Sequence, residues 1–399
     1  MSAQRAPQSG WEKMQGDGIS RSHMTAQDYM MQAIALARPW LGRTSPNPPV
    51  GAVLVDATGR VISTGVHRRA GTPHAEVEAL SAAGDAARGA TLYVTLEPCN
   101  HTGRTGPCTA AILEAGVSQV VFGAHDPNPN VAGGGARFLQ ERGVDVSQES
   151  ESEAGQLIRF FSHQSRTGRP WVTTKTAMSL DGRTATRTGA SKWISGPGAR
   201  MHAHRFRAEV DAILVGVGTV LADDPALTAR SPNAVHETLP VREPLRIVLD
   251  STCRMPPVAA VARRGTLVAT TARAAAANCR QLEETGCEVL VLPTSVDGTG
   301  RVDVVALLEE LGRRGVLSVL VEGGAEVHGT FFDSRLVQEV HAYVAPMIIG
   351  GAAAPGAVAG RGAERIRDAF ALNQLEIDPV GRDLFIRGFT REASCFQES

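Results

Sequence analysis

Four stretches of sequence decide the fold: HAEVEALSAAG (74–84), ATLYVTLEP (90–98), CTAAILEAG (108–116) and SQVVFGAHD (118–126). The first and third are rich in Ala, Leu and Glu and end at Gly84 and Gly116, which predicts two helices because glycine is favoured just beyond a helix end. The second and fourth are rich in β-branched residues and predict strands. Strands that alternate with helices at this spacing indicate an α/β layered sheet.

On the N-terminal side, the pattern after Thr25 (AQDYMMQAIALA) predicts a helix, and the prolines of TSPNPP (44–49) prevent its continuation. VGAVLV (50–55) and VISTGV (61–66) then predict a pair of strands joined by a turn at 56–60. Residues 1–24 are polar and lack periodicity, so we expect a disordered leader, with Met24 as an alternative start.

On the C-terminal side, a Gly/Asn/Pro-rich stretch at 126–136 precedes a short helix and strand that end near Val146, and a charged helix follows at about 148–163. QSRTGRP (164–170) is interpreted as a linker. The rest repeats the alternation, with strands expected in VTTKTAMSLDG, AILVGVGTVL, PLRIVLDS, GTLVATT, CEVLVLP and LSVLVEGG. VHAYVAPMIIG and DLFIRGFT are expected to pair antiparallel. The expected domains are 25–168 and 169–395.

The composition favours small-molecule chemistry. The chain has 399 residues, 43% of them hydrophobic, with 40 Lys+Arg against 41 Asp+Glu. A nucleic-acid partner is not expected, because no basic stripe stands out. Six cysteines in a chain of this length do not form a disulfide framework. We find no signal peptide and no apolar run long enough to span a bilayer, so we expect a cytoplasmic protein without a membrane partner.

A metal site is the strongest chemical signal. His74 starts one expected helix, Cys99 follows a strand, and Cys108 opens another helix. One imidazole and two thiolates form a three-ligand zinc set whose fourth position is left for water, as in catalytic sites. Zinc lowers the pKa of that water to about 7, and Glu76 is placed to take its proton and deliver it to a leaving amine.

The spacing also leaves other interpretations open. The general deaminase pattern is His-x-Glu followed by Pro-Cys-x-x-Cys, whereas NHTGRTGP (100–107) separates the two cysteines here. A single His-x-Glu is more often a surface pair, and each cysteine could be a small core residue. His101 could compete as a ligand, although it lies only two residues from Cys99.

TSPNPPVGAVLV, GVHRRAGTPHAEVEAL and LEPCNHTGRTGPC resemble the deaminase half of the bifunctional pyrimidine deaminase/reductase family of riboflavin biosynthesis. The long loop between the cysteines is normal in that family, although Gly106 stands where a first proline is usual. The resemblance implies a cytidine-deaminase-like three-layer α/β/α domain. It also implies that Asn47, His67 and Arg104 contact substrate, with Arg104 suited to a phosphate. Without the resemblance, His67 would be interpreted as a solvent-facing residue near a strand end.

Three later segments are similar, in order, to the reductase half of the same family: KTAMSLDGRTA with SKWISG, VGTVLADDPALTAR, and VLVEGGAEVHGT. On motif grounds alone, the last is only a strand-to-helix turn. The resemblance implies a dihydrofolate-reductase-like α/β domain that uses NADPH. The implied substrate residues are Lys175, Ser191, Arg207, Leu227, Arg230 and Glu322. The implied cofactor residues are Ala177, Trp193, Thr219, Asp223, Ser251, Gly324, Ala325, Glu326, Val327, His328, Gly329 and Thr330.

Arg207 and Arg230 suit a 5′-phosphate because guanidinium binds it bidentately; otherwise they would be solvated charges. Trp193 could form a wall of the cofactor site or be a core residue. No charge pattern decides between NADPH and NADH, and Cys253, Cys279, Cys287 and Cys395 have no assigned role.

The resemblance implies an enzyme with two activities. The first domain would deaminate 2,5-diamino-6-ribosylamino-4(3H)-pyrimidinone 5′-phosphate, and the second would reduce the product's ribosyl group to ribityl. We expect a homo-oligomer. One alternative is a zinc deaminase of another nucleoside or a tRNA base with a divergent reductase-like domain; another is a zinc-stabilised structural module.

Overall fold

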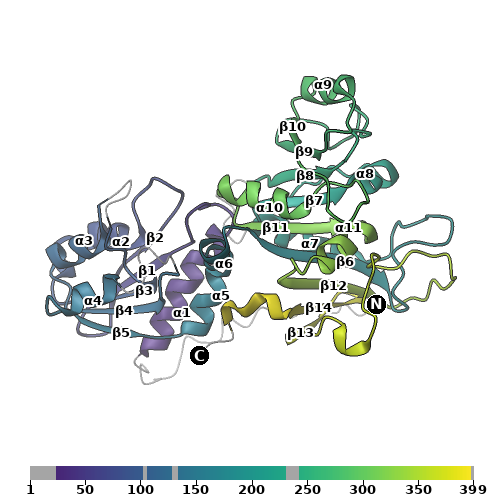
Figure 1. Cartoon of the computed structure of the whole chain (residues 1–399). Helices are drawn as coiled ribbons and strands as arrows, with labels where there is room; N and C mark the ends of the chain where they lie inside the picture. The colour runs from purple at the N-terminus through teal and green to yellow at the C-terminus, as the bar shows by residue number, and fades with distance from the viewer. Residues whose placement is uncertain (1–23, 102–105, 128–133, 231–241, 397–399) are drawn as a thin grey trace, which may run out of the picture.

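The structure is a computed structural model that describes residues 24–101, 106–127, 134–230 and 242–396. Two lobes, each built around its own sheet, are joined through helix α6 (Arg159–Thr167), as Figure 1 shows. Arg104 and the expected leader up to residue 23 lie outside the described residues. Within the described residues, no helix is long and apolar enough to cross a membrane.

The first lobe contains a five-stranded sheet in the order β2-β1-β3-β4-β5. β1 pairs antiparallel with β2 and β3, whereas β3, β4 and β5 run parallel. The strands are β1 (Gly51–Val55), β2 (Val61–Val66), β3 (Thr91–Leu96), β4 (Gln119–Ala124) and β5 (Asp145–Gln148).

Helices cover both faces of this sheet. α1 and α5 pack on one face, and α2, α3 and α4 form the layer on the other. Their bounds are α1 (Ala26–Ala37), α2 (Ala75–Ala83), α3 (Cys108–Ala115), α4 (Gly134–Gln140) and α5 (Glu151–Leu157). The expected three-layer α/β/α domain is therefore confirmed.

Local sequence explains where these helices begin and end. α1 starts at a capping box in which Thr25 and Asp28 bond each other's backbone N–H groups. α3 ends at Gly116, whose φ of 70° is a conformation that glycine adopts without strain. α1 also lies very close to the sheet, since a Cβ on Gly51 would be 2.1 Å from the carbonyl oxygen of Ala33.

The second lobe contains a nine-stranded sheet in the order β10-β9-β8-β7-β11-β6-β12-β14-β13. It is parallel from β10 to β12, and β14 joins β12 and β13 antiparallel. The strands are β6 (Trp171–Ser179), β7 (Ala212–Gly216), β8 (Leu245–Leu249), β9 (Thr266–Thr270), β10 (Glu288–Val291), β11 (Ser318–Gly323), β12 (Glu339–Ala345), β13 (Asn373–Val380) and β14 (Asp383–Phe389).

Alternating residues of the parallel strands build two apolar cores. Ile213 and Val215 of β7 face a core shared with α7, α8 and α9, while Leu214 faces a core shared with α10 and α11. The helices are α7 (Pro197–Glu209), α8 (Val217–Asp223), α9 (Ala276–Glu284), α10 (Val304–Arg313) and α11 (Ala325–Asp333). Short 3₁₀ helices are η1 (Arg38–Trp40), η2 (Gly84–Ala87), η3 (Ile366–Asp368) and η4 (Arg391–Phe396).

Two expectations about the second half need correction. Residues 164–167 are not linker, because α6 continues to Thr167 and ends at Gly168; Gln164 donates to the Gly312 carbonyl oxygen at 3.3 Å and ties the last turn to the second lobe. The expected strands also did not include β13, an edge strand that pairs with β14. The predicted antiparallel pairing of the late strands β12 and β14 is confirmed.

Candidate functional sites

The three expected metal ligands meet at the end of β3 and the starts of two helices. His74 is the N-cap of α2, and Cys108 is the first residue of α3. His74 Nδ1 lies 3.2 Å from Cys108 Sγ and 3.5 Å from Cys99 Sγ, and the three atoms all lie within 4.8 Å of one another. His101 is exposed and is not part of this three-ligand group.

The donor set fits zinc. Tetrahedral coordination with Zn–S of about 2.3 Å and Zn–N of about 2.0–2.1 Å places neighbouring ligand atoms roughly 3.5–3.8 Å apart, close to the spacing found here. The hydrogen bond from Cys108 lowers the pKa of Cys99 to about 4, and the same bond, with burial, raises the pKa of Cys108. The two sulfurs thus share a proton, which a divalent cation would displace.

Glu76 lies in the first turn of α2 beside the ligands and is 4% exposed. Burial and the nearby Cys99 raise the pKa of its carboxyl group. Glu76, His74 and Cys99 line a cavity of about 410 Å³, which is within the range of small-molecule sites. Such a carboxyl group is suited to receive a proton and return it.

Asn47 and His67 also line this cavity, and the His67 ring packs edge-on against His74 with 5.3 Å between the ring centres. His67 is 2% exposed, so the solvent-facing interpretation is wrong. Its Nδ1 lies 3.1 Å from the Pro73 carbonyl oxygen, which only accepts, so Nδ1 carries the proton. Burial lowers the pKa of His67, which leaves Nε2 to accept from Asn47 Nδ2 at 3.0 Å. The bond to His67 thereby fixes which end of the Asn47 amide faces His67.

Phe161 and Glu97 are two of the cavity residues that were not predicted from the sequence. Phe161 lines the cavity from α6, and no local signal indicates this because α6 follows more than 80 residues after His74. Glu97, which is 3% exposed, accepts from the backbone N–H of Ala136 at 3.0 Å and so holds the turn before Cys99. Its position beside Pro98-Cys99 was the only available hint.

In the second lobe, three expected substrate residues form one charged cluster. Both Arg207 Nε and Nη2 donate to the Glu322 carboxylate, at 2.5 and 2.7 Å. Lys175 Nζ lies 4.0 Å from the same carboxylate. Although burial alone raises the pKa of Glu322, Arg207 and Lys175 bring it to about 2. The Arg207 fork that we expected on a phosphate therefore pairs with Glu322, whereas Arg230 is exposed.

Most of the other expected substrate and cofactor residues lie at or beyond the carboxyl ends of parallel strands of the second sheet, the edge at which open α/β sheets bind ligands. Gly324 is the N-cap of α11, and a Cβ built on it would lie 3.5 Å from Thr219 Oγ1. Ser191 Oγ donates to Asp223 at 3.2 Å. Ala177 lies on β6, Ser251 follows β8, Leu227 is buried after α8, and Ala325, Glu326, Val327, His328, Gly329 and Thr330 lie on α11.

Trp193 is 66% exposed, so it is not a core residue. The Arg200 guanidinium lies 4.5 Å from the centre of its ring, and Arg382 donates to the carbonyl oxygen of Ile194 at 3.1 Å. The indole is therefore held at the surface beside α7, where it is available to stack on a ligand.

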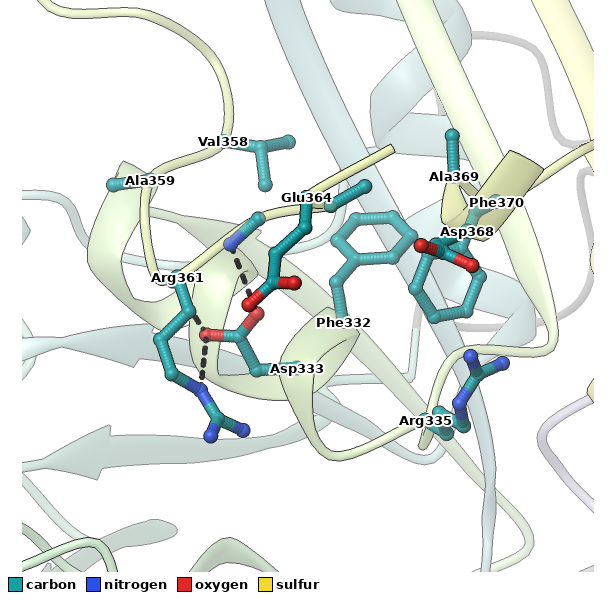
Figure 2. A pocket seen from close by; sticks show the side chains of 12 residues that line it. Phe332, Asp333, Arg335, Val358, Ala359, Arg361, Glu364, Asp368, Ala369 and Phe370 are labelled. Atoms are coloured by element: carbon teal, nitrogen blue, oxygen red, sulfur yellow. Dashed lines mark hydrogen bonds and ion pairs between the residues drawn. The ribbon is translucent and has the colours of Figure 1, made fainter. Parts of the chain in front are cut away.

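A larger cavity of about 520 Å³ lies elsewhere, between the end of α11 and residues 358–370. Figure 2 shows that Asp333 in its wall is bonded to the 361–362 backbone and to Arg361. Arg335 stacks on Phe370, with 5.3 Å from the guanidinium carbon to the ring centre. None of the expected site residues lines it, so cavity size does not identify an active site here.

The fold and the sites define a two-domain enzyme: a zinc-dependent deaminase joined to a reductase. The "Cytidine and deoxycytidylate deaminase zinc-binding region" family matches residues 24–124, and the "RibD C-terminal domain" family matches residues 170–386. The riboflavin biosynthesis protein RibD of Bacillus amyloliquefaciens is 41% identical over 368 residues, covering 91% of this chain and 96% of that protein. That of Escherichia coli K12 is 42% identical, covering 90% and 98%.

Solved structures agree. Acinetobacter baumannii RibD in its form 1 matches with a TM-score of 0.80 at 36% identity, covering 92% of this chain and 98% of that one. A Thermotoga maritima diaminohydroxyphosphoribosylaminopyrimidine deaminase/5-amino-6-(5-phosphoribosylamino)uracil reductase matches with a TM-score of 0.77 at 33% identity, with the same coverage. The chain therefore belongs to the RibD family of bifunctional riboflavin biosynthesis enzymes, whose cofactors are zinc and NADPH.

Proposed function

We propose that the first domain, residues 25–168, hydrolyses the amine of 2,5-diamino-6-ribosylamino-4(3H)-pyrimidinone 5′-phosphate and releases ammonia. The second domain, residues 169–395, then reduces the ribosyl group with NADPH to give 5-amino-6-ribitylaminouracil 5′-phosphate. The observation that carries the proposal is the convergence of His74, Cys99 and Cys108 beside buried Glu76 in one cavity. A charged reductase cluster on the same chain separates this enzyme from single-activity deaminases.

In the deaminase, zinc held by the three ligands would supply a water molecule whose pKa is lowered to about 7. Glu76 receives a proton from that water and delivers it to the departing amine, so that water is consumed and ammonia leaves. Asn47 Oδ1 accepts a hydrogen bond from the substrate, and neutral His67 fixes its orientation. Arg104 would pair with the phosphate.

In the reductase, NADPH supplies the hydride that a ribose carbon accepts. The start of α11 would hold a cofactor phosphate, because its free N–H groups favour an anion and Gly323 and Gly324 have no side chains to obstruct it. Arg207, Lys175 and Glu322 orient the substrate through a fixed array of charges, in which Arg207 is hydrogen-bonded to Glu322 and Lys175 is ion-paired with it. Arg230 is the exposed cation left for the 5′-phosphate.

We propose in addition a cytoplasmic homo-oligomer. Edge strand β13 exposes Leu375 and Ile377, and an exposed apolar edge is suited to pairing with another chain. Five cysteines are free thiols, as expected in a reducing compartment: Cys99, Cys108, Cys253, Cys279 and Cys287. Light scattering of the purified chain tests the oligomer: a monomeric mass would contradict it.

The substrate proposal is tested by measuring ammonia and NADPH oxidation separately on the diaminopyrimidine phosphate. We expect ammonia without NADPH, and NADPH oxidation only after deamination. Ammonia from cytidine or adenosine, with none from the diaminopyrimidine, would overturn it in favour of another nucleoside or tRNA-base deaminase. A structural zinc module would release ammonia from none of these compounds.

A further inference from the structure

The loop that carries Asn47 (residues 42–47) both lines the deaminase cavity and contacts the second lobe. Asn47 lines the deaminase cavity, and its backbone N–H closes a turn on the Thr44 carbonyl oxygen at 2.9 Å. Ser45 and Pro46 form the middle of this turn. The side of the 42–47 loop away from the cavity lies against the second lobe.

Three contacts hold the 42–47 loop against the second lobe. Ser45 Oγ donates to Asp211 Oδ1 at 2.7 Å across 166 residues of sequence. A Cβ on Gly42 would lie 2.7 Å from the Glu209 carbonyl oxygen, and one on Gly315 would lie 3.0 Å from Pro46 Cβ. The crevice that remains between the lobes at this point has a volume of only about 10 Å³, about the minimum for a single water molecule.

Asp211 is held in place within the second lobe. It is 4% exposed, and it precedes β7. Its carboxylate also accepts from Arg242 Nη1 at 2.9 Å and from the Leu317 N–H at 2.8 Å, while its N–H donates to Ser318 Oγ at 2.9 Å. The acceptor offered to Ser45 is therefore held in place and is paired with the Arg242 guanidinium.

This anchor lies at the end of the sheet opposite to the reductase cluster. Asp211 and Leu317 precede the parallel strands β7 and β11, whereas Glu322, Gly324 and Thr219 lie at or beyond the carboxyl ends of these strands. A substitution at Ser45 or Asp211 should therefore affect the deaminase cavity and leave the reductase residues unchanged.

We infer that Asp211, although it belongs to the reductase domain, is a positioning residue of the deaminase: through Ser45 it holds the turn that presents Asn47 to the substrate. The inference rests on the proposed deaminase function. It makes the reductase domain a structural part of the deaminase site, so that a deaminase domain cut away from it should bind the substrate more weakly.

The test is Ser45→Ala in the full zinc-loaded chain. Loss of a hydrogen bond to a charged group should raise the KM of the diaminopyrimidine about tenfold. The kcat should change little, because Asn47 contacts ground and transition states alike. Ser45→Thr, which keeps the hydroxyl, should restore the KM. Asp211→Asn should raise the KM too, and the double variant should be no worse than the singles.

Ser118→Ala is the matched control, since it removes a serine hydrogen bond of the first lobe, to the Gly89 carbonyl oxygen at 2.9 Å, that involves neither the loop nor Asp211. We expect it to leave the deaminase KM unchanged, and we expect NADPH oxidation on the deaminated substrate to be unchanged in Ser45→Ala. An active wild type whose KM does not respond to Ser45→Ala would overturn the inference, as would an equal rise in Ser118→Ala. A wild type that releases no ammonia would overturn the proposed function and this inference with it.

Discussion

Replacing Glu76 with glutamine isolates the proton-transfer role within the deaminase site. Glutamine keeps the size and polarity of the buried side chain but does not exchange a proton. Because the zinc ligands His74, Cys99 and Cys108 are untouched, the metal content should stay the same. The volume-conserving change should also cost little stability.

The structure sets the size of the expected loss. General acid–base catalysis is typically worth about 10²–10⁴-fold. Three titratable neighbours in the described cavity wall are poorly placed to substitute for Glu76: His67 has both ring nitrogens bonded, Glu97 accepts from the Ala136 N–H, and His101 is exposed. We therefore expect a fall in deaminase kcat of about 10³-fold or more, or about 4 kcal/mol in the barrier.

The assay measures ammonia release, bound zinc, and NADPH oxidation on the deaminated substrate. Glu78→Gln is the matched control, because Glu78 lies on the same helix but bonds the Val66 N–H at 3.2 Å and Arg68. It should keep both activities. A Glu76→Gln variant that retains more than about a tenth of the deaminase kcat would contradict the proton-transfer role of Glu76. A variant that loses its bound zinc together with its activity would contradict it as well.

Three further outcomes are expected. Gly51→Ala should lower the free energy of unfolding by about 3 kcal/mol or more in urea titrations, because its Cβ would clash with the Ala33 carbonyl oxygen; an unchanged midpoint would contradict the packing of α1. Arg159→Met should lower the free energy of unfolding by about 2–3 kcal/mol, since it removes one partner of the fully buried Glu339. Burial raises the pKa of Glu339, but Arg159 and its other partners bring it well below its ordinary value. The stability that Glu339 contributes is therefore present above about pH 4 and is lost as the pH falls further, and Arg159→Met should show a shallower loss in that window. Arg207→Lys keeps the charge but loses the two-point bond to Glu322, so NADPH oxidation should fall about tenfold or more while ammonia release is unchanged; an equal fall in both would contradict the separation of the sites.

Local sequence patterns were sufficient to predict most helices and strands of the first domain. The helix at 26–37, the strand pair at 51–66 and the helices closed by Gly84 and Gly116 follow from caps, β-branched runs and turn residues. The zinc ligands were found because each stands at a helix start or a strand end. β13 was missed because its apolar and polar residues alternate over only a few positions and almost all are exposed, and it is defined only by pairing with β14.

Contacts between residues far apart in the chain could not be predicted from the sequence. Both Arg207 and Glu322 were expected to contact substrate, but their pairing joins residues 115 positions apart. The same applies to Ser45 and Asp211, which no local pattern connects. The order of the second sheet, with β11 between β6 and β7, also depends on how distant strands pack rather than on any one segment.

The central claim is that one zinc ion, held by His74, Cys99 and Cys108, drives ammonia release and nothing else on this chain. Titrating metal-free protein with Zn²⁺ while following both half-reactions tests it most directly. Ammonia release should rise linearly and stop at one zinc per chain, and NADPH oxidation on the deaminated substrate should stay constant throughout. Full ammonia release from metal-free protein, or a parallel zinc dependence of both reactions, would contradict the account.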